Sequence, residues 1–301
     1  MPNKENNEEV FRKVVLNWYP GHMAKTRKEI IKSLQLIDIV IEILDARIPI
    51  SSRNPDIQEI TKNKKKIILL NKIDLADEKE TLKWKEYFLK ESNCCLLTDS
   101  NSGKGINQVS KKIEELMEEE KRKAALKGRI NRTIRLMILG IPNVGKSSFI
   151  NRISKTGKLE VANRPGVTRQ NQWIRIGKNQ ELLDTPGVLW PKFESAEVAL
   201  NLSFTGTIKD EILDLQEITY ELLRILNEKY QDKLFERYKI NINEWKELQQ
   251  FPNNIFELMK LIARKRGAIV SGGKEDIEKI SRIILDDFRN GKIGRITLEE
   301  V

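Results

Sequence analysis

Two short motifs in this chain contain the residue types that bind a nucleotide. The first, residues 140–147, reads Gly-Ile-Pro-Asn-Val-Gly-Lys-Ser and matches the phosphate-binding pattern G-x-x-x-x-G-K-S. In such a loop, glycines let backbone N–H groups approach the phosphates, Lys146 reaches the β- and γ-phosphates, and Ser147 ligates Mg²⁺. An apolar run at 135–139 precedes the loop and a helical pattern at 146–153 follows it, which is the context that the motif requires.

The second motif, Asn71-Lys72-Ile73-Asp74, predicts that the base is guanine. Asp74 can accept hydrogen bonds from N1–H and from the exocyclic amino group of guanine. Adenine offers neither donor and would leave the carboxylate unpaired, which opposes its binding. Asn71 would contact N7 and join this motif to the phosphate loop, and Lys72 would lie over the base.

Two other segments are expected to contact the nucleotide. The strand pattern at 94–98 ends in Asp99 and Ser100, whose backbone N–H groups are candidates for reaching O6 of guanine, although such loops usually carry a small residue at the position of Asp99. The remaining candidates for binding GTP in the phosphate loop are Pro142, Asn143, Val144, Gly145 and Ser148.

A third motif, Asp184-Thr185-Pro186-Gly187, follows the last strand pattern. Asp184 is the candidate that holds Mg²⁺ through water, and Gly187 would face the γ-phosphate. Thr168 lies between this motif and the phosphate loop, so it is either an ordinary loop residue or the switch threonine, which ligates Mg²⁺ only when the γ-phosphate is present.

The order of these motifs is reversed relative to an ordinary GTPase, in which the phosphate loop comes first. This order predicts a circularly permuted GTPase, cut after the strand that ends at Asp184. Both the N-terminal arm and the C-terminal part of the chain are then attached beside the switch. A contact with the γ-phosphate that orders the switch could therefore bias the C-terminal domain directly.

Strand and helix patterns alternate through the first two thirds of the chain, which favours a doubly wound, mostly parallel sheet. After about residue 195 the strand patterns stop, and helical periodicity continues to the end. We therefore expect an arm at 1–23, a GTPase domain at 24–194 and an all-helical domain at 195–301. The expected strands are 38–45, 66–70, 94–98, 135–139, 173–176 and 181–183, and the expected helices of the GTPase domain are 24–37, 78–90, 106–125 and 146–153.

Composition narrows the class of protein. The net charge of +10 over 301 residues favours an acidic partner, with nucleic acid first and a membrane surface second, or else simply a soluble basic protein. The adjacent Cys94 and Cys95 lie in an apolar run and are interpreted as reduced core residues of a cytoplasmic protein. One histidine and two cysteines are too few for a zinc finger. The first ten residues are too polar for a signal peptide, and no apolar run is long enough to span a bilayer.

His22, the single histidine, precedes a helical pattern whose N-terminus should lie on the nucleotide side of the sheet. It is therefore either a helix-capping residue or part of the hydrolytic machinery. Val188 follows the third motif, where Ras-like enzymes use a glutamine to orient water. Either another group takes over that task, or hydrolysis is very slow.

The chain resembles the bacterial ribosome biogenesis GTPase A family (YlqF-like) in these motifs and their permuted order. The resemblance implies a factor needed late in large-subunit assembly, which binds GTP and GDP and is stimulated to hydrolyse GTP by the ribosomal subunit. It also implies that His22 acts in hydrolysis beside Lys146, and that Asn143 coordinates K⁺ next to the phosphates. The segments that carry this resemblance are 18–25 (Trp-Tyr-Pro-Gly-His-Met-Ala-Lys), 140–148, 184–188, 262–267, 270–273 and 291–297.

Three functions remain open at this point. The chain is a GTP-hydrolysing assembly factor, an RNA-binding module that keeps GTP as a structural ligand, or a GTPase at a membrane, for which the sequence offers no anchor. We expect a monomer that contacts ribosomal RNA and proteins. Basic clusters at 62–66, 121–123, 129–135 and 264–266 are either phosphate-contacting surfaces or ordinary solvated faces, and the last also ends a helical pattern before Gly267.

Overall fold

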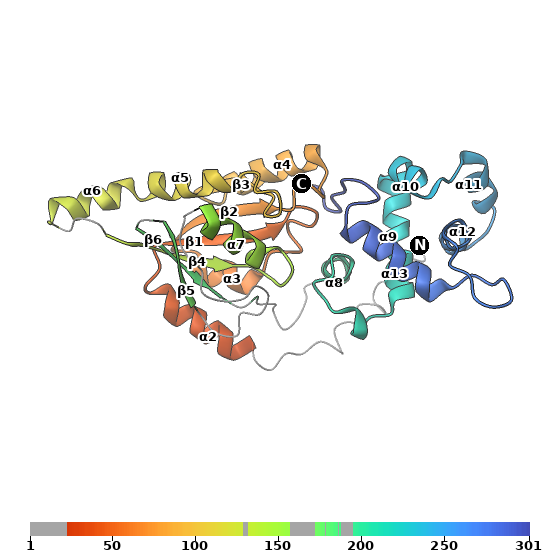
Figure 1. The fold of residues 1–301 in the computed structure, drawn as a ribbon, viewed down its shortest axis with the longest axis horizontal. Coiled ribbons are helices and arrows are strands. Elements are labelled where there is room, and N and C mark those ends of the chain that lie inside the picture. Colours follow the sequence, from red (N-terminus) through yellow and green to blue (C-terminus); the bar gives the residue numbers. More distant parts are fainter. Residues whose placement is uncertain (1–22, 129–131, 157–171, 178, 186, 188–194) are drawn as a thin grey trace. The chain divides into compact units, whose positions relative to one another are not determined.

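The structure is a computed structural model, and it describes residues 23–128, 132–156, 172–177, 179–185, 187 and 195–301 (Figure 1). The described residues form two compact units. One contains the residues from 23 to 187 together with 299–301, and the other contains 195–298.

The first unit is built on a six-stranded sheet with the order β3-β2-β1-β4-β6-β5. All neighbouring strands are parallel except β5 and β6, which form an antiparallel edge. Each of the six predicted strands is present within one residue of its expected bounds. The strands are β1 (Ile39–Asp45), β2 (Lys65–Asn71), β3 (Cys94–Leu97), β4 (Ile134–Leu139), β5 (Gln172–Gly177) and β6 (Gln180–Asp184).

This strand order explains how the reversed motifs still meet. If the end of β6 were joined to the start of β1, the chain would run β4-β5-β6-β1-β2-β3, with the phosphate loop first. In the folded chain β4 lies between β6 and β1, so the connections leave the centre of the sheet in opposite directions. Ligands of open α/β sheets bind at the carboxyl edge of such a point.

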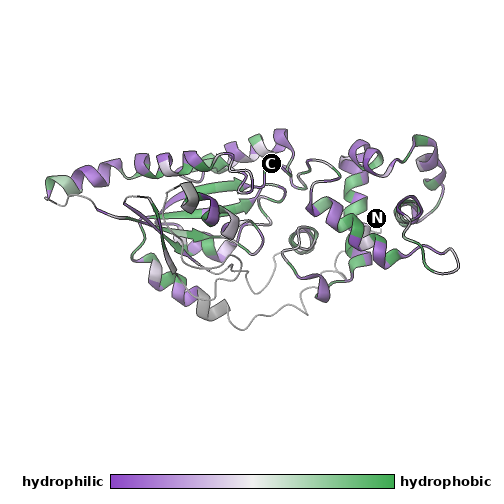
Figure 2. Cartoon of the chain, viewed as in Figure 1, coloured by the Kyte–Doolittle hydropathy of each residue, from purple (hydrophilic) through white to green (hydrophobic). Residues whose placement is uncertain are grey.

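Helices cover both faces of the sheet. Residues of alternate parity point to opposite faces of a strand, and Val40, Leu44 and Ile68 point to the face covered by α2 (Met23–Leu34), α3 (Pro55–Thr61) and α4 (Glu78–Leu89). The opposite face, which carries Ile41 and Ile67, is covered by α5 (Ile106–Leu116) and α7 (Lys146–Thr156). The hydropathy colouring shows that apolar residues are concentrated in the sheet (Figure 2).

The structure differs from the sequence prediction in two helices. The helix expected at 106–125 is two helices, α5 and α6 (Glu118–Leu126), because Met117 leaves the helical conformation (φ −106°, ψ 5°) with its side chain buried. The helix α3 was not predicted. Its start has a clear local signal, however, because Asn54 accepts a hydrogen bond from the backbone N–H of Asp56 and Pro55 occupies the first turn.

The second unit is helical. Its central helix α9 packs against α8, α10, α12 and α13, and Leu258, Met259 and Ile262 of α12 are buried at the spacing expected of an amphipathic helix. Its helices are α8 (Ala196–Phe204), α9 (Leu215–Lys229), α10 (Gln231–Tyr238), α11 (Ile242–Leu248), α12 (Asn254–Arg266) and α13 (Ile277–Arg289), with a 3-10 turn at Asp210–Ile212.

The basic cluster at the end of α12 is engaged within this unit. Arg264 pairs with Glu275, Lys265 pairs with Glu244, and Arg266 contacts Asp287 and lies over the ring of Tyr238. The helix ends at Gly267, which has the left-handed conformation (φ 66°). These contacts favour the helix-end interpretation of residues 264–266 over that of a free phosphate-contacting surface. Among the described helices, none combines the length and the apolar character needed to cross a membrane.

Candidate guanine-nucleotide site

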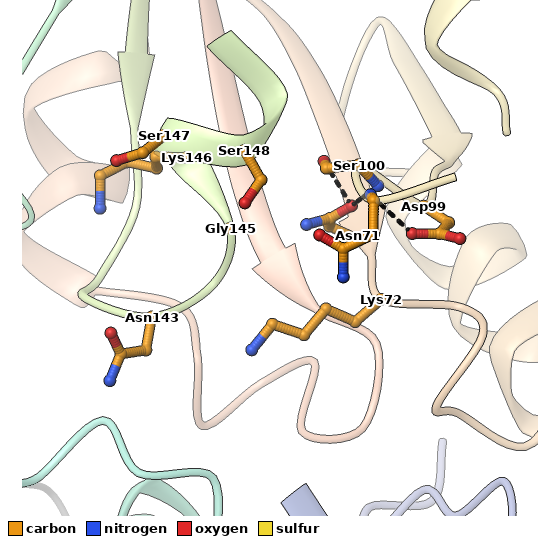
Figure 3. A pocket seen from close by; sticks show the side chains of 10 residues that line it. Asn71, Lys72, Asp99, Ser100, Asn143, Gly145, Lys146, Ser147 and Ser148 are labelled. Carbon is orange, nitrogen blue, oxygen red and sulfur yellow. Dashed lines mark hydrogen bonds between the residues drawn. The ribbon is translucent and has the colours of Figure 1, made fainter. Parts of the chain in front are cut away.

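The phosphate loop and the NKID motif line a single pocket of about 280 Å³ at the carboxyl edge of the sheet (Figure 3). The loop follows β4, the NKID motif begins at the end of β2, and Asp99 and Ser100 follow β3. Because these strands are parallel, their carboxyl ends lie at the same edge. The pocket is lined by Asn71, Lys72, Asp99, Ser100, Asn101, Asn143, Gly145, Lys146, Ser147 and Ser148.

Asn71 joins the two motifs. Its side-chain nitrogen donates a hydrogen bond to the carbonyl oxygen of Val144 (2.8 Å), which is the link between NKID and the phosphate loop that the sequence predicted. Its side-chain oxygen accepts from the backbone N–H of Ser100 (3.0 Å) and from the Ser100 hydroxyl (2.8 Å). Asn71 is buried, so its amide fixes three segments relative to one another with all these polar groups satisfied.

The loop after β3 is held in the same network. The backbone N–H of Ser100 is directed to Asn71, and the carboxylate of Asp99 accepts from the backbone N–H of Asn101 (2.8 Å). The backbone N–H of Asp99 donates to the carbonyl oxygen of Lys104 (2.9 Å), so the N–H groups of both Asp99 and Ser100 already have partners. A backbone contact of this loop with O6 of guanine stays a prediction.

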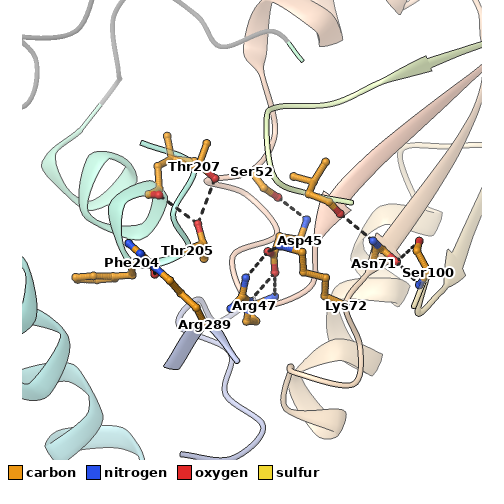
Figure 4. Close-up of polar contacts among 12 residues, drawn as sticks. Asp45, Arg47, Ser52, Asn71, Lys72, Ser100, Phe204, Thr205, Thr207 and Arg289 are labelled. Carbon is orange, nitrogen blue, oxygen red and sulfur yellow. Dashed lines mark hydrogen bonds and ion pairs between the residues drawn. The ribbon is translucent and has the colours of Figure 1, made fainter. Parts of the chain in front are cut away.

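Lys72 is oriented by a buried ion cluster that the sequence analysis missed. Its ammonium nitrogen lies 3.0 Å from a carboxylate oxygen of Asp45, which also binds the Arg47 guanidinium through bonds of 2.8 and 3.0 Å (Figure 4). Burial raises the pKa of Asp45, but the charges of Arg47 and Lys72 outweigh this effect and hold the pKa well below its usual range. No local pattern in the sequence indicated this cluster, because only the folded sheet places Asp45, at the end of β1, directly opposite Asn71 on β2.

The turn at Lys72 has an unusual backbone. Lys72 has φ 63°, a left-handed conformation that lysine seldom adopts. Strain of this kind persists where neighbouring contacts fix the chain, and it is concentrated at binding sites. Burial lowers the pKa of Lys72, while the nearby Asp45 charge opposes that shift.

The phosphate loop packs closely on the NKID motif. Gly145 has φ 100°, and a Cβ atom there would lie 2.3 Å from the side-chain nitrogen of Asn71, so only glycine fits. Asn143 also has a positive φ of 63°, which asparagine tolerates better than most residues, and its side chain is exposed at the pocket. Pro142 is half-buried and Val144 is buried beneath the loop.

Lys146 is folded back onto its own loop. Its ammonium group donates to the carbonyl oxygens of Gly140 (2.9 Å) and Ile141 (2.7 Å) and is buried. Burial lowers the pKa of Lys146 to about 8, and the negative charge of Asp184 partly opposes this shift. A buried cation at the mouth of an anion-binding loop gains energy when a phosphate approaches.

The third motif lies against the phosphate loop. A Cβ atom at Gly187 would approach the Lys146 ammonium nitrogen to 2.8 Å and the Pro142 nitrogen to 3.0 Å, so a side chain has no room there. Asp184 ends β6 and is 9% exposed. Its carboxylate and the exposed hydroxyl of Ser147 are hard oxygen ligands of the kind that Mg²⁺ prefers. These residues fit the Mg²⁺ site that a GTPase of this class requires.

Asp74 differs from its neighbours because it is exposed and does not line the pocket. Burial and the nearby negative charge of Asp99 raise the pKa of its carboxyl group. The carboxylate that the sequence predicts to specify guanine therefore lies near a like charge. The predictions for hydrolysis and for the switch depend on His22, Thr168 and Val188, which lie outside the described residues.

Comparisons with known proteins show the family of this chain. Residues 135–250 match the family model described as "50S ribosome-binding GTPase". The match begins at β4 and omits the NKID motif, as a permuted chain predicts. The chain is similar to Ribosome biogenesis GTPase A of Bacillus licheniformis (46% identity, 95% of this chain, 99% of the relative) and of Thermotoga maritima (31% identity, 94% of each).

Two solved structures are similar in fold to this chain over most of its length. The GNP-bound structure of YlqF from T. maritima has a TM-score of 0.62 and 28% identity, and covers 92% of this chain and 98% of that one. A GDP-bound YlqF structure also has a TM-score of 0.62, with 27% identity. The six-stranded P-loop domain, its helical C-terminal partner and this similarity over nearly the whole length establish that the chain is a GTP-hydrolysing enzyme of the ribosome biogenesis GTPase A family.

Proposed function

We propose that this enzyme acts late in the maturation of the large ribosomal subunit, and that the subunit stimulates its hydrolysis of GTP to GDP and phosphate. The observation that carries this proposal is the pocket in which Asn71 links a guanine motif to a phosphate loop. The names of the relatives support a ribosomal partner. The excess of positive charge on the chain, +10, suits a particle whose surface is rich in RNA phosphate.

Each side chain of the site has a proposed task in binding. Asp74 accepts from the guanine N1–H and amino group, Lys72 lies over the base, and Asn71 contacts N7. Ser100 and Asp99 border the base from the opposite loop. The phosphates lie on the backbone of the loop and the N-terminus of α7, with Lys146 on the β- and γ-phosphates. The loop residues that surround them are Pro142, Asn143, Val144, Gly145, Ser147 and Ser148.

Mg²⁺ would be held by Ser147, by Asp184 through water and by Thr168 in the GTP state, and it would neutralise charge on the β- and γ-phosphates. Gly187 would donate its backbone N–H to the γ-phosphate, which its close fit against Lys146 supports. Asn143 offers an exposed side-chain oxygen beside the phosphates, where K⁺ could bind. We propose that His22 completes the site when the subunit docks the N-terminal arm, since Val188 cannot orient water.

The test is a co-sedimentation experiment with purified large ribosomal subunits. We expect binding with a non-hydrolysable GTP analogue and weak binding with GDP, together with faster GTP turnover when subunits are added. Large subunits from cells depleted of this protein should bind more strongly than mature ones if the enzyme acts late in assembly. Equal binding in both nucleotide states, with unchanged turnover, would contradict the proposal and favour a module that keeps GTP as a structural ligand.

A further inference from the structure

A second recess lies on the GTPase unit, away from the nucleotide. It has a volume of about 470 Å³ and lies between the C-terminal ends of α3 and α4. Its floor contains Lys66 near the start of β2, whereas the nucleotide pocket begins at Asn71 at the other end of that strand. Five residues of strand span about 16 Å, so the two sites are separate. The charged residues that line the recess are Arg53, Lys62, Lys64, Lys66, Lys90 and Glu91.

The floor of this recess is built from buried charges. Glu42, Arg53 and Lys66 are 1%, 7% and 7% exposed. Arg53 and Lys66 lie 3.6 and 3.5 Å from the carboxylate of Glu42, which accepts no hydrogen bond from the described residues. The adjacent positions on this face, Val40 and Ile68, are apolar and pack under the helices.

Buried charges at such a position are unfavourable unless they are well paired. The guanidinium of Arg53 also binds Glu91 (2.6 Å) and lies over the ring of Phe88, but its Nε has no hydrogen-bond partner among the described residues. The floor therefore keeps a buried guanidinium with one N–H group unpaired within the described part of the chain, beside the buried ammonium group of Lys66.

The rim of the recess adds free cations. Lys62 and Lys90 are exposed, and neither has a carboxylate partner among the described residues. Five cationic side chains line the recess, while only Glu91 and the underlying Glu42 are acidic, which leaves an excess of three positive charges. A concave surface with this excess attracts anions and concentrates their approach.

We propose that this recess binds backbone phosphates of structured ribosomal RNA. Lysine and arginine contacts to phosphate provide most of the affinity of proteins for RNA helices, which are recognised by shape and backbone. The inference rests on the proposed binding to the large subunit and assigns part of that contact to the GTPase unit. It also differs from the end of α12, where Arg264, Lys265 and Arg266 already pair with carboxylates of their own unit.

The experiment compares three double variants of the full-length protein, two with alanine and one with arginine. Lys62→Ala/Lys90→Ala removes both rim cations. Lys79→Ala/Lys111→Ala removes two other exposed lysines of the same unit that do not line the recess and have no carboxylate partner among the described residues. Binding to large subunits is measured with a non-hydrolysable GTP analogue over a series of KCl concentrations. Thermal melting and GTP affinity are measured for each variant.

We expect the rim variant to bind subunits at least fivefold more weakly, with the slope of log K against log salt reduced by about 1 to 2. The control variant should match wild type, and Lys62→Arg/Lys90→Arg should retain binding because it keeps both charges. GTP affinity should be unchanged throughout. If the rim and control variants bind subunits with the same affinity and the same slope, the recess is not an RNA site.

A second experiment separates this inference from the proposed function. If the wild-type protein does not bind subunits, the proposed function fails, and the recess is then judged by filter binding of the same variants to protein-free ribosomal RNA. Loss of RNA binding by the rim variant alone supports the recess. If instead the rim variant loses only the binding of inorganic pyrophosphate, or of an acidic peptide, and binds RNA as the control does, the RNA assignment is wrong.

Discussion

The ammonium nitrogen of Lys72 lies 3.0 Å from a carboxylate oxygen of Asp45, at the carboxyl ends of two adjacent strands. Asp45 thereby holds the lysine that is proposed to cover the guanine base, and Arg47 holds Asp45 from the other side. Lys72 also adopts a left-handed backbone conformation, which persists where surrounding contacts fix the chain, and this ion pair is one such contact. We therefore propose that Asp45 is a positioning residue for the nucleotide site.

Asp45→Asn should weaken GTP binding by about tenfold, because Lys72 loses the charge that orients it. A double-mutant cycle with Lys72→Ala checks the cause by isothermal titration. In the Lys72→Ala background, the Asp45 change should have little further effect on affinity. Full additivity of the two changes would show that Asp45 acts by another route, such as the folding of the Arg47 loop.

GTP binding should take up a proton in mildly alkaline solution. The pKa of Lys146 in the free protein is about 8, so at about pH 8.5 most of its amino groups are neutral. The phosphates stabilise the ammonium form and raise its pKa, so affinity should decrease as the pH rises through 8. Titration calorimetry in buffers of different ionisation enthalpy measures this uptake. The absence of proton exchange between pH 8 and 9 would contradict it.

Asp99→Asn should move the acid limit of GTP binding to lower pH. The guanine base requires ionised Asp74, whose pKa is raised by burial and by the Asp99 charge, so affinity is lost as the pH falls through that raised pKa. Asparagine keeps the oxygen that accepts from Asn101 but removes the like charge. The measurement is GTP affinity from pH 4 to 7. Asp286→Asn, an exposed change in the helical unit, is the control and should leave the profile in place.

Glu299→Ala should lower the free energy of unfolding of the GTPase unit by about 1.5 to 3 kcal/mol. The buried Glu299 carboxylate accepts from the backbone N–H groups of Ile50 (2.6 Å) and Ser51 (2.9 Å) and from the Ser51 hydroxyl. Urea unfolding followed by tryptophan fluorescence is a suitable measurement, since the Trp84 indole N–H donates to the Glu299 carbonyl (3.2 Å). Glu300→Ala is the matched control, and this exposed neighbour should change stability by no more than about 0.5 kcal/mol.

The His22→Ala variant should bind GTP with wild-type affinity. Its rate of GTP hydrolysis in the presence of large subunits should fall by a factor on the order of 10² to 10⁴. The reason is that a docked arm would supply the group that orients water or charge in place of the missing glutamine. Single-turnover hydrolysis, with and without subunits, decides the matter. A variant that is stimulated as strongly as wild type would remove His22 from the mechanism.

The sequence by itself determined the strands and the class of nucleotide. The strands are short runs of buried β-branched and aliphatic residues, so they were located to within one residue. The phosphate loop and NKID have residue types that follow from the chemistry of phosphate and guanine, and their reversed order predicted the permutation. The missed helix α3 is only seven residues long, too short for periodicity to reveal. The long helix is interrupted at Met117, a residue type that favours helix, so its local sequence did not indicate the break.

Tertiary structure alone decided which charges meet. Asp45 is an ordinary acidic residue in the sequence until β1 lies beside β2 and places it against Lys72. The basic residues at 62–66 and 264–266 look alike as runs, but folding leaves Lys62 without a carboxylate partner among the described residues and pairs Arg264 to Arg266 with acidic residues distant in the chain. Glu299 likewise returns to the GTPase unit. Such contacts depend on which residues the fold brings close in space, and no local pattern of residue types encodes that proximity.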